Sequence, residues 1–250
     1  MKKSIIVPAV LLSTGLFLLG SCGNSDSSSM KAPLSKQPDS GNSKQKNDGM
    51  NGDTSKSTTV VIMDAKSKTI DNMQAAYKGE TTASAKYAAY SRKAEEEGFH
   101  EIALLFKAAS MAENIHANNH KSVLQESGET VPVIKPEFTV LTTRENLEDA
   151  IKGETYEASV MYPEFITTAN DAGNQLALIS LNYAYKTEKK HKVMYETALT
   201  ALQNNTVKTL PIVFYVCPTC GNTYENSAPA RCGISMTSSE RFIKITSLNS

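Results

Sequence analysis

A carboxylate and an imidazole recur three positions apart at two places in this chain, each inside a segment with strong helical periodicity. Glu113 and His116 form the first pair, and Glu188 and His191 form the second. Residues three apart share one face of a helix, and the apolar residues around each pair follow the steps of three and four that are typical of a buried face. The charged pairs therefore stand where leucine or isoleucine would normally pack, and any fold of this chain must accommodate them.

The apolar periodicity predicts four long helices, at about residues 69–97, 99–126, 142–173 and 177–202. Gly98 and Gly173 stand where left-handed C-terminal caps are expected. Thr142 and Glu145 form a capping box that opens the third helix, which we expect to be one continuous helix. The segment before it contains Pro132 and cannot be helical throughout.

The two helix pairs are copies of one another. The sequence Lys-Gly-Glu-Thr at 78–81 recurs at 152–155, and the distance from Glu80 to Glu113 is 33 residues against 34 from Glu154 to Glu188. This similarity indicates an internal duplication. Each copy supplies one Glu from its first helix and a Glu-x-x-His from its second.

Loop lengths predict how the helices are connected. The turns at Gly98 and Gly173 are short, so each pair is antiparallel, whereas the connection over residues 129–141 spans at most ~45 Å. That reach matches a helix of ~27 residues, and the connection can therefore cross the whole bundle. We expect an all-α fold, a ferritin-like four-helix bundle with one long crossover, followed by a small C-terminal domain.

The charged residues on the inner faces predict a metal centre. Each uncompensated buried carboxylate costs several kcal/mol, which a fold stable by only ~5 to 15 kcal/mol cannot bear five times. Two divalent irons would supply four compensating charges. Carboxylate with imidazole suits iron or manganese, and this ligand set is that of ferritin-like di-iron or di-manganese sites. The seven predicted ligands are Glu80, Glu113, His116, Glu154, Glu157, Glu188 and His191.

Glu157 makes the duplication asymmetric, because Ala83 stands at the equivalent place in the first copy. The sequence around it, Gly-Glu-Thr-Tyr-Glu at 153–157 followed by Tyr-Pro-Glu-Phe at 162–165, resembles the third helix of rubrerythrins. The resemblance extends over all four helices and the C-terminal segment. It implies a non-haem di-iron peroxidase that reduces hydrogen peroxide to water in oxidative stress defence.

The resemblance also implies roles for individual residues. Glu113 and Glu188 would bridge the metals, Glu80 and Glu154 would be terminal ligands, and His191 would hold the second iron. One iron would shift between Glu157 and His116 as the redox state changes. Tyr87 and Tyr162 match family tyrosines that form hydrogen bonds around the site. Of the remaining histidines, we expect His120 to pack in the bundle or to support the ligands from behind, and His100 to be exposed.

The C-terminal segment contains a metal knuckle, Cys217-Pro-Thr-Cys220-Gly. Rubrerythrins carry a rubredoxin-like domain here with a second C-x-x-C, whereas this chain has Cys232 followed by Ser235. An oxygen-ligated iron of shifted potential, a zinc site and no metal all remain open, and export would also allow Cys217 and Cys220 to form a disulfide. We predict a metal site with three cysteines, holding one iron or zinc.

The N-terminus has the features of an export signal: two lysines, an apolar run over residues 5–19, then Gly-Ser-Cys22. The last residues resemble a bacterial lipobox, so we expect Cys22 to be lipidated and the protein to be exported and anchored to a bacterial membrane. The expected regions are a signal peptide at 1–22, a disordered tether at 23–62, a ferritin-like domain at 63–205 and a degenerate rubredoxin-like domain at 212–250.

Two other functions remain open. One is a ferroxidase, and the other is an iron-binding lipoprotein with vestigial redox activity, which the missing fourth cysteine supports. The 26 basic and 26 acidic residues balance, so nucleic acid is not an expected partner. We expect a homodimer, and the electron donor is unknown.

Overall fold

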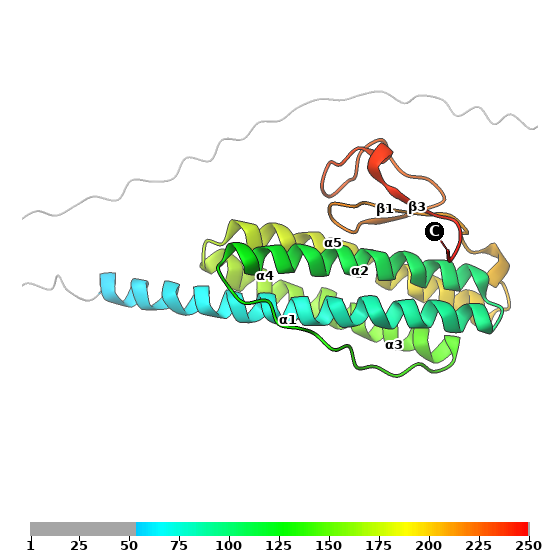
Figure 1. Ribbon diagram of the computed structural model, residues 1–250, viewed down its shortest axis with the longest axis horizontal. Helices are drawn as coiled ribbons and strands as arrows, with labels where there is room; N and C mark the ends of the chain where they lie inside the picture. The colour runs from blue at the N-terminus through cyan, green and yellow to red at the C-terminus, as the bar shows by residue number, and fades with distance from the viewer. Residues whose placement is uncertain (1–53, 250) are drawn as a thin grey trace, which may run out of the picture. The chain divides into compact units, whose positions relative to one another are not determined.

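The computed structural model describes residues 54–249. In this part of the chain, long helices form a bundle and a small sheet follows them (Figure 1). Cys22 and the expected signal peptide and tether up to residue 53 lie outside the described residues. The elements are α1 (Thr54–Glu96), α2 (His100–Glu126), α3 (Thr143–Tyr156), the π-helical segment η1 (Glu157–Met161), α4 (Tyr162–Asp171), α5 (Gln175–Gln203), the 3-10 helices η2 (Val207–Thr209) and η3 (Ser239–Arg241), and the strands β1 (Phe214–Val216), β2 (Thr223–Glu225) and β3 (Ile243–Ile245).

Tight turns join the helices within each pair, as the glycines predicted. Gly98 adopts a φ of 84° and Gly173 a φ of 67°, a left-handed conformation in which a side chain would be strained. The amide after each glycine donates back into the preceding helix, for example from Phe99 to the carbonyl of Ala94 at 2.8 Å. These caps satisfy carbonyls at the helix ends and reverse the chain between α1 and α2 and between α4 and α5.

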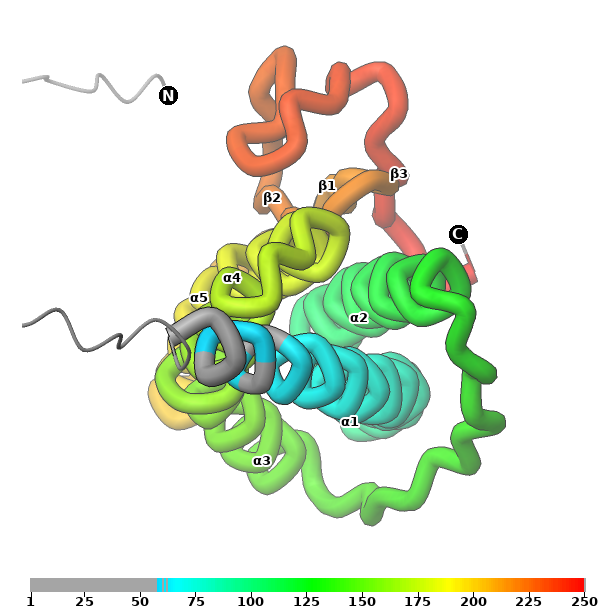
Figure 2. Tube along the Cα trace, turned by 90° about the vertical axis from the view of Figure 1, so that its left-hand side faces the viewer, coloured from blue at the N-terminus to red at the C-terminus, as the bar shows by residue number. Residues whose placement is uncertain are grey.

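The long crossover runs beside the bundle from the end of α2 to the start of α3 (Figures 1 and 2). It ends in the predicted capping box, in which the Thr142 hydroxyl accepts from the amide of Glu145 and the Glu145 carboxylate accepts from the amide of Thr142. The carboxylate of Glu97, in the turn between α1 and α2, also accepts from the amide of Thr143 at 2.9 Å. The structure thus confirms a four-helix bundle with one long crossover.

The third helix is helical from Thr143 to Asp171, as expected, but it is not α-helical throughout, which the periodicity did not predict. An α-helix, the π-helical segment η1 and a second α-helix follow one another between Thr143 and Asp171. A π-helical turn takes up one residue more than an α-helical turn. The distance from Glu154 to Tyr162 is 8 residues, whereas the equivalent distance from Glu80 to Tyr87 is 7. The extra residue of the second copy is therefore absorbed in η1, and the residues on either side of it keep their inward positions.

The first helix begins earlier than the periodicity indicated. Helix α1 starts at Thr54, so the expected tether, which extended to residue 62, overlaps its first turns. Val61 and Met63 are exposed in this part of α1, whereas Thr69 is buried. Extending a helix that is already formed costs far less than starting one, so the helix continues beyond the part that packs in the bundle. An apolar pattern detects only the packed part.

The C-terminal segment forms a three-stranded antiparallel sheet in the order β2-β1-β3, with Phe214 opposite both Glu225 and Ile245. It lies on the side of the bundle that α2 and α5 form (Figure 2). Lys190 on α5 connects the two parts by donating to the side chain of Asn222 at 2.6 Å. Among residues 54–249, no helix combines the length and the apolar composition that crossing a membrane requires.

Two apolar clusters fill the bundle on either side of a charged middle layer. One contains Phe106, Leu147 and Tyr195, and the other contains Met73 and Leu181. The buried Glu and His residues stand between these clusters, with a buried Glu on each of α1, α2, α3 and α5 and a buried His on α2 and α5. Packing on both sides excludes water from the middle layer and fixes its side chains.

Candidate metal centre

The four helical stretches of the bundle bring two groups of four donor residues together in the middle layer. Within each group, one ligand atom per residue lies within 4.8 Å of the others. Glu113 and Glu188 belong to both groups, so the arrangement has the form of two metal positions that share two carboxylates. The groups are Glu80, Glu113, His116 and Glu188, and Glu113, Glu154, Glu188 and His191.

These six residues are almost completely buried, each with at most 1% of its surface exposed. One carboxylate oxygen of each glutamate accepts no well-aligned hydrogen bond from the described residues: Glu80 Oε2, Glu113 Oε1, Glu154 Oε2 and Glu188 Oε1. Two of these oxygens have an imidazole nearby, since Glu113 Oε1 lies 3.1 Å from His191 Nδ1 and Glu188 Oε1 lies 2.9 Å from His116 Nδ1. An unpartnered buried carboxylate oxygen is costly. Four of them facing one another in a water-free layer fit a pair of metal ions, which would coordinate all four.

Without a cation, the two terminal carboxylates, Glu80 and Glu154, retain their protons above the usual pH range. Burial raises the pKa of Glu80 to about 8, and repulsion from Glu113 adds to this shift. Burial likewise holds the pKa of Glu154 well above its usual range, with further repulsion from Glu188. Divalent cations would replace these protons and remove the repulsion.

The pKa values of the two histidines of the centre are raised as well, although burial by itself would lower them. Burial acts to lower the pKa of His191, but the Glu113 and Glu188 carboxylates together outweigh burial and raise that pKa to about 10. The pKa of His116 is likewise raised well above its usual value, because Glu188 and Glu113 outweigh burial. Burial would raise the pKa of Glu113, but the facing His191 and His116 hold it below its usual value. In the absence of metal, imidazolium groups thus substitute for part of the missing positive charge.

The C-terminal loop determines which nitrogen of each histidine faces the centre. Nε2 of His116 lies 3.0 Å from the carbonyl oxygen of Cys220, which can only accept, so Nε2 carries a proton. Nε2 of His191 lies 3.0 Å from the Thr223 hydroxyl, which itself donates to the carbonyl of Gly221. Nδ1 of both histidines consequently points at the carboxylates, as a metal ligand must.

Sequence reasoning did not find this contact between the loop and the histidines. Nδ1 of His116 lies 2.9 Å from Glu113 Oε2 and 2.9 Å from Glu188 Oε1, while its other nitrogen touches a residue 104 positions away. No local pattern carries such information. The one sequence feature that could have indicated this contact is Gly221, because glycine permits close approach of a loop backbone.

Two tyrosines support the terminal carboxylates in a reciprocal way. The Tyr87 hydroxyl, on the first copy, donates to Oε1 of Glu154 on the second copy at 2.6 Å. The Tyr162 hydroxyl, on the second copy, donates to Oε1 of Glu80 on the first. The duplication is thus visible as an approximate two-fold arrangement around the centre, and each of these glutamates keeps its other oxygen for a metal.

Glu157 stands apart from the other predicted ligands. It is the first residue of η1 and is partly buried, and it belongs to neither group of four donors. Burial, together with repulsion from Glu80 and Glu154, holds its pKa well above the usual range. It therefore lies within electrostatic reach of the centre, although the described geometry does not bring it together with His116.

The other two histidines occupy different environments. His100 lies at the start of α2, with Nδ1 2.8 Å from a carboxylate oxygen of Glu95, and it takes no part in the centre. His120 is fully buried one turn beyond His116 and contacts Ser180 and Tyr162. It supports the region behind Glu80 rather than coordinating.

The C-terminal knuckle brings three buried cysteines together, Cys217, Cys220 and Cys232. All three are free thiols, and Cys220 Sγ lies 3.4 Å from Cys232 Sγ. The hydrogen bond from Cys220, together with that from Ser235, lowers the pKa of Cys217 to about 4 despite burial. A thiolate beside two further sulfurs fits a metal ion.

Ser235 stands at the edge of the cysteine cluster. Its Oγ lies 3.3 Å from Cys217 Sγ and 2.8 Å from the hydroxyl of Thr237, which in turn donates to Thr219 at 2.8 Å. The hydroxyl thus occupies the place of the missing fourth cysteine. Three thiolates and one oxygen are the donors available to a metal there.

Comparison with known proteins shows which family combines a four-helix bundle of this kind with these metal-binding residues. Residues 71–199 match the family model for rubrerythrin. Rubrerythrin-2 of Clostridium acetobutylicum is 32% identical over 175 residues, which cover 70% of this chain and 95% of that protein. Nigerythrin of Nitratidesulfovibrio vulgaris is 34% identical over 188 residues, which cover 72% of this chain and 91% of that protein.

Solved structures agree with this assignment. Fully reduced, all-ferrous nigerythrin matches with a TM-score of 0.63 at 32% identity, covering 70% of this chain and 86% of that one. A bacterioferritin of Mycobacterium tuberculosis, at 20% identity and a TM-score of 0.51 over 55% of this chain and 87% of its own, shares the ferritin-like fold. The chain therefore belongs to the rubrerythrin family and carries the di-iron centre of that family's redox enzymes of oxidative stress defence.

Proposed function

We propose that this protein reduces hydrogen peroxide to water. The observation that carries the proposal is the contact between the two metal sites: Cys220 belongs to the thiol cluster, and its carbonyl oxygen accepts from His116 of the di-iron centre. A thiolate-bound iron is a one-electron carrier. This contact supports a path for electrons from the knuckle to the centre through one residue and one hydrogen bond.

The reaction balances with two electrons and two protons for each hydrogen peroxide, and it yields two water molecules. A reduced iron pair would supply both electrons at once. The chain's own residues would hold that pair in a dry, fixed geometry: Glu113 and Glu188 between the two positions, and Glu80 and Glu154 at the ends, each held by a tyrosine hydroxyl. Such a site would polarise an oxygen substrate while these four carboxylates keep their positions.

We also propose that Glu157 exchanges with His116 as ligand when the redox state changes. Glu157 is the first residue of η1, and π-helical turns are frequent at functional sites. His116 is held from behind by the Cys220 carbonyl. A change in the position of the knuckle loop would therefore affect His116, the ligand that is exchanged.

The cellular setting is part of the proposal. The sequence Leu-Gly-Ser-Cys at 19–22 supports lipidation at Cys22, and thus an exported protein held at a bacterial membrane. We propose a homodimer, and an electron donor other than a cytoplasmic nicotinamide enzyme. Mass spectrometry of the membrane fraction would identify the lipidated N-terminus, and an unmodified Cys22 would contradict the anchor.

Stopped-flow absorption of the reduced, iron-loaded protein tests the reaction. We expect hydrogen peroxide to oxidise the iron pair much faster than dioxygen does, and Glu157→Ala to slow that reaction while iron content stays the same. Faster oxidation by dioxygen than by peroxide would contradict the proposal and favour a ferroxidase.

The knuckle can be tested separately through Ser235→Cys, which restores four thiolates. We expect the variant to gain thiolate-to-iron absorption and to raise peroxide turnover with a rubredoxin reductase as donor, because four sulfurs suit rapid one-electron transfer. Unchanged turnover, with four sulfurs bound, would show that the knuckle does not limit electron supply and would favour a protein that mainly binds iron.

A further inference from the structure

His120 has a buried imidazole that is neither a predicted metal ligand nor a group with a role in the peroxide reduction proposed above. Its side chain is fully inaccessible, yet both ring nitrogens have partners: Nδ1 lies 2.8 Å from Ser180 Oγ, and Nε2 lies 3.2 Å from the Tyr162 hydroxyl. Tyr162 in turn donates to Oε1 of Glu80. A continuous hydrogen-bonded chain therefore joins Ser180 to a predicted metal ligand.

The direction of these hydrogen bonds follows from the donors available. Tyr162 has a single hydroxyl proton and gives it to Glu80, so its oxygen must accept from Nε2 of His120. A neutral imidazole protonated at Nε2 has a bare Nδ1, which can only accept from the Ser180 hydroxyl. Burial, with a smaller effect of His116, lowers the pKa of His120 to about 3, consistent with a neutral ring. All three hydrogens point toward Glu80.

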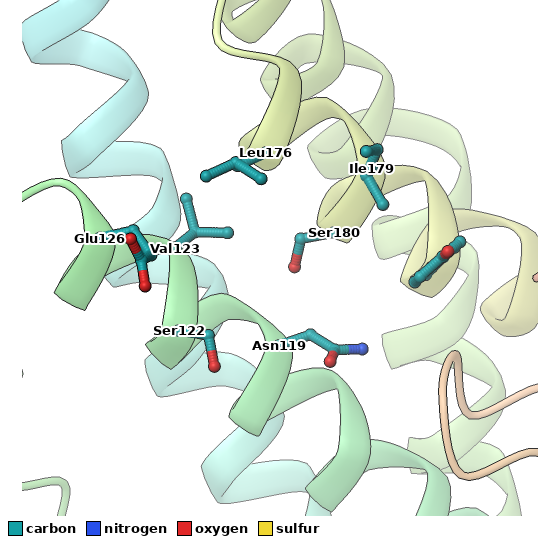
Figure 3. A pocket seen from close by; sticks show the side chains of 8 residues that line it. Asn119, Ser122, Val123, Glu126, Leu176, Ile179 and Ser180 are labelled. Atoms are coloured by element: carbon teal, nitrogen blue, oxygen red, sulfur yellow. The ribbon is translucent and has the colours of Figure 1, made fainter.

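The outer end of this chain reaches a pocket at the surface. A pocket of about 160 Å3 lies between α2 and α5, and Ser180 is one of the residues that line it. Figure 3 shows the Ser180 side chain among the lining residues, with Asn119 and Ser122 on the facing helix and Leu176 and Ile179 beside it. Ser180 has only 4% of its surface exposed, so it stands at the boundary between the pocket and the interior.

The other copy of the duplication has no equivalent. His120 lies 7 residues after Glu113, and Tyr195 lies 7 residues after Glu188. Tyr195 is buried and its hydroxyl has no hydrogen-bond partner within the described chain. The hydrogen-bonded chain is therefore a feature of one half of the centre, the half that contains Glu80 and His116.

We propose that Ser180, His120 and Tyr162 form a proton relay from the pocket between α2 and α5 to Glu80, an inference that rests on the proposed peroxide reduction. That reaction consumes two protons in a water-free layer, so a path for protons is required. A proton enters at Ser180 Oγ, and each step breaks one O–H or N–H bond as the next forms. Tyr162 gives its proton to Oε1 of Glu80, and that new O–H bond breaks as an O–H bond forms on an oxygen of the peroxide that is being reduced, while solvent in the pocket supplies the proton that Ser180 has passed on. No electron moves along the relay, and its members are relay residues rather than ligands.

Two variants interrupt the relay without removing a predicted ligand. Ser180→Ala removes the entry hydroxyl, and His120→Gln keeps a polar side chain of similar size that cannot pass a proton between two atoms. Ser122→Ala is the matched control, since this serine lines the same pocket but donates to the carbonyl of Asn118.

The measurement is single-turnover oxidation of the reduced, iron-loaded proteins, in H2O and in D2O. We expect oxidation to slow on the order of 100-fold for His120→Gln, at the lower end of the range for positioned proton transfer, and less, on the order of 10-fold, for Ser180→Ala at the entry. The solvent isotope effect should rise in both, with iron content and absorption unchanged. Ser122→Ala should match the wild type. Wild-type rates and isotope effects in both relay variants would overturn the relay.

This experiment separates the relay from the proposed function. Each protein is oxidised with peroxide and, in parallel, with dioxygen. A wild type that reacts only with dioxygen contradicts peroxide reduction, yet the relay is still tested by the dioxygen rates, since reduction of dioxygen also consumes protons.

A second measurement needs no turnover. In the zinc-loaded protein, the 15N chemical shifts of His120 should report a neutral ring protonated at Nε2. A proton on Nδ1, or a charged ring, would overturn the relay whatever the oxidant.

Discussion

At the scale of single residues, the closest approach of the C-terminal loop to the centre depends on Gly221. Its φ of 74° is left-handed, and a Cβ there would overlap Nε2 of His116 and lie 3.1 Å from the carbonyl of Ala112. Only glycine lets the loop place the Cys220 carbonyl against that histidine. The residue therefore serves the knuckle and the di-iron centre at once.

Gly221→Ala should push the loop away from His116. We expect a loss of about 1 to 3 kcal/mol in the free energy of unfolding from backbone strain alone, or roughly 2 to 10 °C in the melting temperature. Electron transfer from the knuckle to the di-iron centre should also slow. Gly233→Ala is the matched control, since a Cβ there meets only the Tyr224 hydroxyl at 3.8 Å. Equal effects of the two substitutions on melting and on electron transfer would contradict this role.

At the scale of elements, η1 explains how a duplicated helix pair became asymmetric. Tyr87 follows Glu80 by 7 positions in the first copy, and Tyr162 follows Glu154 by 8 in the second, yet both tyrosines reach the opposite glutamate. The π-helical segment takes up the extra residue and presents Glu157 beside the centre. The one-residue insertion thus adds the Glu157 carboxylate, while Tyr162 still reaches Glu80.

Deleting Val160, which is half exposed in η1, should convert this segment to ordinary α-helix. The spacing would then equal that of the first copy, so we expect helical content by circular dichroism and two irons per chain to be retained, while the effect of Glu157→Ala on peroxide oxidation disappears. Deleting Asn114, an exposed residue of α2, is the comparison. It separates Glu113 from His116 by two positions instead of three and should abolish iron binding. Loss of iron in both deletions would contradict the assignment.

At the scale of the whole molecule, the charged middle layer connects stability to metal content. The folded pKa of Glu80 is about 8 against an ordinary 4.5, and that of His191 is about 10 against 6.5. Between the unfolded and folded values, the folded protein holds more protons than the unfolded one, so its stability falls as pH rises. Two lowered pKa values act oppositely: that of His120, about 3, only below about pH 6.5, and that of Cys217, about 4, over the range up to the ordinary thiol value of about 8.5. The raised pKa values of Glu154, Glu157 and His116 add to those of Glu80 and His191 and outweigh the thiol.

The metal-free protein should therefore lose stability as pH rises from about 6.5 to 9. We expect its melting temperature to fall by several degrees over this range, whereas the iron-loaded protein should change little because metal replaces the protons. Thermal scans with and without a chelator, at pH 6.5, 8 and 9, measure the difference. A metal-free protein that becomes more stable with rising pH would contradict this account.

Local pattern predicted a large part of the fold. The helix turns at Gly98 and Gly173 and the capping box at Thr142 depend on residues only a few positions apart, and the structure has each of them. The start of α1 and the break at η1 were not predicted. The first turns of α1 carry no apolar stripe, so periodicity does not predict them. The π-helical segment keeps the residues on either side of it facing inward, so periodicity does not reveal the change there either.

The sequence by itself determined the identity of the donors, because the duplicated spacing of Glu and Glu-x-x-His places them on the inner faces of any helices that form. Only the tertiary structure decided which atoms they use. Nδ1 of His116 faces the centre because a loop from the C-terminal segment occupies Nε2, and His120 faces Ser180 because α2 and α5 pack together there. Hydrogen bonds between residues 60 to 104 positions apart depend on packing, and no local pattern in the chain encodes them.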